Sequence, residues 1–77
     1  MRVAYDEAVD AAYISLVDIE AGGVATTVPG EPGSKAFEIN LDFDREGLLV
    51  GIEVFGASSR LPLDFLGRFA NRFATPA

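Results

Sequence analysis

The side chains best able to do chemistry in this sequence are acidic residues grouped around one glycine. They fall at the first, third, fifth and twelfth positions of an EF-hand calcium loop, with Gly47 at the sixth: Asp42, Asp44, Glu46 and Glu53. Only Glu46 departs from the Asp or Asn usual at its position. This spacing makes the four residues a weak calcium-loop candidate.

A calcium loop of this kind must sit between two helices, and the flanking segments are not helical in pattern. From Phe37 to Asp44 every odd residue is apolar and every even residue is polar, and the alternation resumes after Gly47. Period-two alternation predicts half-buried strands at 36–44 and 48–55. The sequence therefore predicts a β-hairpin closed by Gly47, with no metal ion and no cofactor.

Paired carboxylates could also divide acid and base roles in a hydrolase. Five acids would be available for this: Asp6, Asp10, Asp42, Asp44 and Glu53. However, the chain has no histidine, cysteine or tryptophan and no glycine-rich phosphate loop. Asp6 and Asp10 fit better as turn residues whose carboxylates accept backbone N–H bonds. We assign no catalytic residues and expect a protein that is not an enzyme.

The elements that would position these residues make one domain over residues 1–77. Strands are predicted at about 2–5, 12–18, 24–28, 36–44 and 48–55, and a helix at about 59–73. The predicted fold class is α+β, a single antiparallel β-meander of four to five strands with a C-terminal amphipathic helix packed on one face. The helix prediction rests on one apolar stripe: Leu61, Phe65, Leu66, Phe69 and Phe73.

The formal net charge of −6 is unevenly distributed along the chain. Residues 1–53 carry a balance of −8, and residues 54–77 carry a balance of +2. An acidic body repels nucleic-acid phosphate and anionic lipid, so we expect neither nucleic acid nor membrane as a partner. A basic protein partner is compatible with the charge. The absence of cysteine and of an apolar leader segment predicts a cytoplasmic protein.

Several short segments, taken in order, resemble one bacterial family, domain of unknown function 2283. They are Tyr5-Asp6, Asp10 to Ile14, Asp42 to Gly47, Gly51 to Val54, and Ala57-Ser58. The resemblance covers about residues 2–61, with Ala12 in place of a larger aliphatic residue and a longer Pro-Gly loop. The family has no established catalytic residues, so the resemblance implies a small prokaryotic domain of unassigned activity.

One sheet and one helix cannot bury both faces of this sheet. The apolar side chains left over are predicted interface residues: Tyr13, Val17, Leu49, Phe55 and Phe73. The first hypothesis is therefore a non-catalytic protein-interaction domain that self-associates as a homo-oligomer, most simply a dimer. The alternative is an acidic, antitoxin-like protein that neutralises a basic partner. A carboxylate-based enzyme is the third hypothesis.

Overall fold

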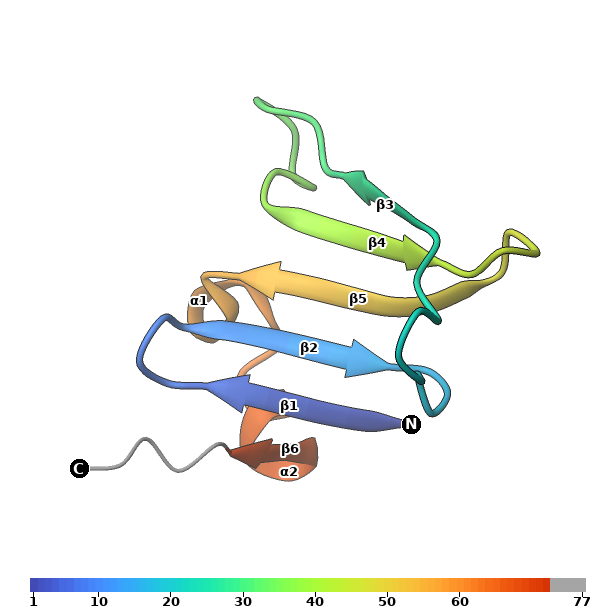
Figure 1. Cartoon of the computed structure of the whole chain (residues 1–77). Coiled ribbons are helices and arrows are strands. Elements are labelled where there is room, and N and C mark those ends of the chain that lie inside the picture. Colours follow the sequence, from blue (N-terminus) through green and yellow to red (C-terminus); the bar gives the residue numbers. More distant parts are fainter. Residues whose placement is uncertain (73–77) are drawn as a thin grey trace.

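The computed structural model describes residues 1–72 and builds them around one six-stranded sheet (Figure 1). The strands are β1 (Arg2–Asp6), β2 (Ala11–Ser15), β3 (Thr26–Pro29), β4 (Ile39–Phe43), β5 (Leu49–Phe55) and β6 (Ala70–Arg72). The helices are α1 (Ala57–Arg60) and α2 (Phe65–Phe69). Strands β1 to β5 pair antiparallel, which confirms the predicted α+β class. Within residues 1–72, neither helix has the length and apolar character needed to cross a membrane.

The strand order is β3-β4-β5-β2-β1-β6, so the sheet is not the simple meander that the sequence predicted. Strands β3, β4 and β5 follow one another as neighbours, while β2 lies beside β5, as in a Greek key traced in reverse. A meander would have placed β3 in the centre, beside β2. Because β3 is exposed along its length and ends in Pro29, it suits only an edge. The seven-residue β5 fills the centre instead.

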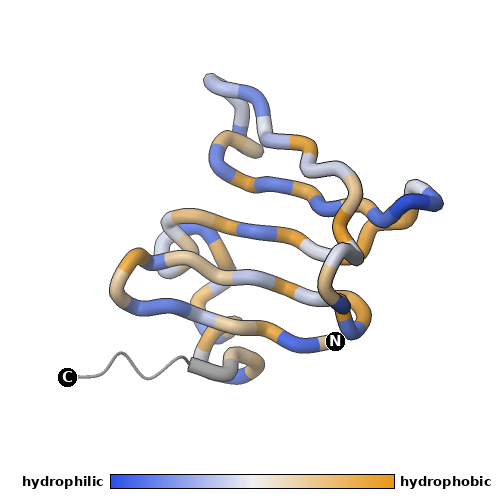
Figure 2. The backbone as a smooth tube through the Cα atoms, viewed as in Figure 1, coloured by the Kyte–Doolittle hydropathy of each residue, from blue (hydrophilic) through white to orange (hydrophobic). Residues whose placement is uncertain are grey.

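The predicted hairpin is confirmed, because β4 and β5 are adjacent and antiparallel. Gly47 has a φ of 82°, the left-handed conformation that the short turn was expected to need. Apolar and polar residues alternate along β4, and in β5 the apolar residues Val50, Ile52 and Val54 lie on one face (Figure 2). Several strands are shorter than predicted: β4 starts at Ile39 rather than residue 36, and β2 ends at Ser15 rather than residue 18. The third strand lies at Thr26–Pro29 rather than 24–28.

The single helix predicted over residues 59–73 is wrong in its extent. Leu61 has extended dihedral angles (φ −91°, ψ 154°) and ends α1, and α2 begins only at Phe65. Leu61 precedes Pro62, and the ring of a proline disfavours helical dihedral angles in the residue before it. After α2 the chain forms β6, which pairs parallel with β1. The predicted interface residue Phe73 lies outside the described residues.

One face of the sheet carries two apolar rows that run across the strands. Cross-strand partners form the first row: Tyr5, Ala12, Val54 and Ile39. The second row is Val3, Ile14, Ile52, Leu41 and Val28. Ala57, Leu61, Leu66 and Ala70 pack against the first row. The helical segments therefore cover this one face, mainly over β1, β2 and the end of β5 (Figure 1).

Candidate functional site

The acidic residues of the hairpin serve separate structural roles. Asp44 Oδ1 accepts hydrogen bonds from the Glu46 and Leu48 backbone N–H groups, each at 2.9 Å, and so shapes the turn. Glu53 accepts a bond of 3.2 Å from the Asn40 amide. Within residues 1–72, no three acidic side chains gather into a group that could hold a metal ion. The spacing that resembles a calcium loop arises here from a strand, a turn and a second strand.

The polar face of the sheet is organised around Asp42. Its carboxylate accepts hydrogen bonds of 2.6 Å from both the Tyr13 and the Thr27 hydroxyl groups. Tyr13 lies on β2 and Asp42 on β4, so the tyrosine ring must cross β5 to reach the carboxylate. Gly51 is the residue that permits the crossing, because a Cβ atom there would overlap the Tyr13 ring and hydroxyl. This arrangement ties the two halves of the sheet together.

Burial and the neighbouring carboxylate raise the pKa of Tyr13 to about 12. Loss of solvent contact is the larger cause, and the hydrogen bond to Asp42 adds to it. The neutral hydroxyl donates to Asp42, so Tyr13 acts as a hydrogen-bond donor and not as a base at neutral pH. The polar face therefore holds a structural cross-link and no activated nucleophile among these residues.

We predict that Tyr13 stays protonated in the folded protein well above the pH at which a free tyrosine ionises, about 10. Because the folded pKa exceeds the unfolded one, this group's contribution to stability is complete below about pH 10 and is lost as pH rises toward 12. Tyrosinate absorbance of a Tyr5→Phe variant isolates the Tyr13 titration. Asp42→Asn should shift that titration to lower pH, and an unchanged curve would show that Asp42 has no part in it.

Asp10 joins the first hairpin to α1. Its carboxylate accepts bonds from the Tyr5 hydroxyl (2.6 Å), the Ser58 hydroxyl (2.8 Å) and the Ser58 backbone N–H (3.0 Å). Its backbone oxygen accepts a further bond from Ala57 N–H at 3.0 Å. These hydrogen bonds hold the pKa of Asp10 below its ordinary value. The bond from Tyr5 contributes most, and the bonds from Ser58 come next. The turn role predicted for Asp6 is confirmed, because its carboxylate accepts a hydrogen bond of 2.9 Å from Ala8 N–H. The Asp10 carboxylate instead binds Ser58, 48 residues away in the sequence.

Four of the predicted interface residues lie on or beside the polar face, and Tyr13 is shared by two depressions there. Tyr13 and Phe55 line a depression of about 230 Å³ on the polar face, together with Val9. Val17 lies beyond the end of β2, and Leu49 starts β5 opposite Phe43. The role of these residues in self-association stays a prediction.

An apolar area that the helices leave partly uncovered lies on the other face. Along the second apolar row, exposure rises from 1% at Val3, through half-buried residues, to 46% at Val28. Leu16, which follows β2 and is 38% exposed, extends this area by strand alternation. We call this less covered part the open strip and define it by five residues, the half-buried Ile14, Leu41 and Ile52 and the exposed Leu16 and Val28. The sequence analysis did not identify these five residues as interface candidates.

Residues 2–58 match the family described as a protein of unknown function, DUF2283. The chain belongs to the DUF2283 family. The match spans β1 to β5, the Asp10–Ser58 contact and the whole open strip. No curated protein and no solved structure matches the chain.

The DUF2283 match leaves α2 and β6 outside it. These two elements contribute Leu66 and Ala70 to the packing over the first apolar row. The DUF2283 portion by itself therefore places even more of the apolar face at the surface. The apolar face is therefore a better candidate than the polar face for the functional surface of residues 2–58.

Proposed function

We propose that this protein is a non-catalytic interaction domain that self-associates through the open strip, with a second copy of the same chain as the partner. The observation that carries the proposal is the gradient of exposure along the second apolar row, from buried at Val3 to 46% exposed at Val28. Beyond the buried Val3, the row continues as cross-strand partners on four neighbouring strands, Ile14, Ile52, Leu41 and Val28. A surface of this kind usually marks an interaction site.

Charge favours a second copy on this face rather than on the polar one. The open strip contains no charged residue, so two acidic chains can meet there without bringing like charges together. The polar face carries three acidic residues, Asp6, Asp42 and Glu53, against Arg2, so two such faces in contact would repel. Contact through the open strip therefore brings two copies of a chain of net charge −6 together with less electrostatic repulsion than contact through the polar face.

The geometry suits a two-fold contact between sheets. Two sheets pack face to face about 10 Å apart with their strands nearly aligned. A two-fold axis would place the open strip of one copy on that of the other, which makes the contact self-complementary. Fully burying a large aliphatic side chain stabilises by roughly 1.5–3 kcal/mol, and the strip supplies five partly exposed ones per copy.

A basic protein is the second proposed partner, on a different observation. The loop after β2 and the β4–β5 turn together line a depression with Glu20, Asp44 and Glu46. Arg45 is the one basic residue among those that line it. This acidic end of the molecule does not overlap the open strip.

Sedimentation equilibrium at micromolar concentration tests the self-association. We expect a dimer for the natural chain and a monomer for Val28→Lys, because a lysine cannot be buried in the contact without a partner. Phe55→Lys is the matched control, since Phe55 is 36% exposed on the opposite face. It should remain dimeric.

Either of two results would contradict the proposal. The natural chain could be monomeric at these concentrations, or Phe55→Lys could be monomeric while Val28→Lys remains dimeric. The second result would place the contact on the polar face instead. Far-UV circular dichroism of each variant shows whether the sheet is intact.

A further inference from the structure

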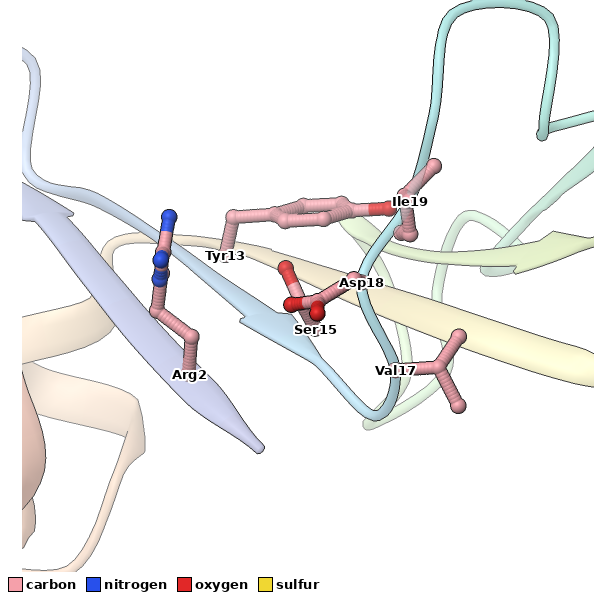
Figure 3. Close-up of a pocket in the computed structure, with 6 residues that line it drawn as sticks. All are labelled: Arg2, Tyr13, Ser15, Val17, Asp18 and Ile19. Carbon is pink, nitrogen blue, oxygen red and sulfur yellow. The ribbon is translucent and has the colours of Figure 1, made fainter.

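A depression of about 310 Å³ lies on the polar face where β1 begins and β2 ends. It is lined by Arg2, Tyr13, Ser15, Val17, Asp18 and Ile19. Arg2 and Ser15 are cross-strand partners, and Tyr13 lies on the same face two residues before Ser15. Figure 3 shows the Arg2 and Tyr13 side chains projecting to the same side, while Val17 points away from them. The depression is open to solvent and lies opposite the open strip.

Three of the four polar side chains that line it have no partner among the side chains that the structure describes. The Arg2 guanidinium, the Ser15 hydroxyl and the Asp18 carboxylate form no hydrogen bond or ion pair there. Arg2 and Asp18 are of opposite charge and line the same depression without pairing to each other. By contrast, the Tyr13 hydroxyl is already used by Asp42, so its ring serves as a wall.

We propose that this depression binds a free α-amino acid with an apolar side chain. The ligand carboxylate would accept hydrogen bonds from the Arg2 guanidinium, whose planar fork matches a carboxylate. The ligand ammonium group would donate to Asp18, and Ser15 could bond either end. The apolar side chain of the ligand would lie against the Tyr13 ring and Ile19.

The lining chemistry favours a zwitterion over a simple ion. A simple anion would meet the Asp18 carboxylate, and a simple cation would meet Arg2, so each would gain one contact and suffer one repulsion. A ligand with both charges on one carbon satisfies both residues. The volume is at the small end of the roughly 300–1,000 Å³ typical of small-molecule sites, which suits a ligand of this size.

Titration of the amide resonances of the full chain with L-leucine tests the proposal. We expect saturable shifts at residues of β2 and the following loop, with a dissociation constant on the order of millimolar for so open a site. Arg2→Gln and Asp18→Asn should each weaken binding about three- to tenfold. Arg68→Gln, an exposed arginine on α2, should leave the affinity unchanged.

Two leucine analogues separate the contributions of the two charged residues. Leucinamide lacks the carboxylate, so its binding should depend on Asp18 and not on Arg2. 4-Methylpentanoate lacks the ammonium group, so its binding should depend on Arg2 and not on Asp18. The proposal is overturned if leucine gives no saturable shifts at tens of millimolar, if either variant binds leucine as the natural chain does, or if an analogue depends on the other residue.

Discussion

Replacing Asp10 by alanine is expected to lower the melting temperature by about 5 °C or more. The substitution removes the acceptor for three hydrogen bonds, two from Ser58 and one from the Tyr5 hydroxyl. Tyr5 is only 7% exposed as a residue, and its hydroxyl loses the acceptor of a 2.6 Å hydrogen bond. Asp10 also has a φ of 52°, a conformation that aspartate and asparagine tolerate better than alanine does. Thermal unfolding followed by circular dichroism measures the effect.

Asp6 provides the matched control for Asp10. It lies in the same connection between β1 and β2, and its carboxylate accepts one bond, from Ala8 N–H. Asp6→Ala should therefore lower the melting temperature much less than Asp10→Ala. Equal effects of the two substitutions would show that the contact with α1 contributes nothing beyond the local turn.

The same contact makes stability depend on acid pH. The pKa of Asp10 is lowered in the folded protein, first by the Tyr5 hydroxyl and then by Ser58. The unfolded state therefore binds this proton more readily, and the contribution of Asp10 is present above about pH 4 and lost as pH falls through the lower folded pKa. In Asp10→Asn this part of the pH dependence should be absent, and an unchanged acid profile would contradict the assignment.

Gly51→Ala is expected to reduce the free energy of unfolding by about 1–3 kcal/mol. The added Cβ would overlap the Tyr13 ring, which could no longer lie across β5 to reach Asp42. The pKa of Tyr13 should fall at the same time, since its hydroxyl loses the carboxylate partner and becomes more solvated. Urea unfolding and tyrosinate absorbance measure the two effects independently.

Gly67→Ala is the control for Gly51→Ala. Gly67 lies inside α2, and a Cβ atom there would meet nothing within 4 Å. Alanine is favoured over glycine in a helix interior by about 1 kcal/mol, so this variant should be as stable as the natural chain or more so. If Gly51→Ala kept both the stability and the high Tyr13 pKa, the crossing of β5 by the tyrosine would not occur in solution.

Local patterns were sufficient to predict the central hairpin. Its alternation specified which residues of β4 and β5 face the core, and Gly47 specified the turn. The prediction of one helix over 59–73 was wrong. The apolar stripe has helical spacing, but Pro62 disfavours helical dihedral angles at Leu61, where α1 ends. Here a single local restriction outweighed a periodic pattern.

Contacts between distant segments could not be predicted. Asp10 and Ser58 are 48 residues apart, and no period or motif links them. Gly51 gives no sign in the sequence that a tyrosine from β2 lies over it. The position of β3 at the edge could have been inferred from Pro29, since proline is confined to sheet edges. The exposure of the open strip depends on how much of the sheet α1 and α2 cover, and this follows from the tertiary structure rather than from any local pattern.

Intermolecular contacts between methyl groups test the central proposal, self-association through the open strip, most directly. In a sample that mixes isotope-labelled with unlabelled chains, isotope-filtered nuclear Overhauser spectra report only contacts between copies. We predict such contacts among the methyl groups of the open strip, from Val28 and Leu41 to Leu16. Contacts confined to Val9 and the Phe55 ring on the polar face, or no contacts between copies at all, would contradict the proposal.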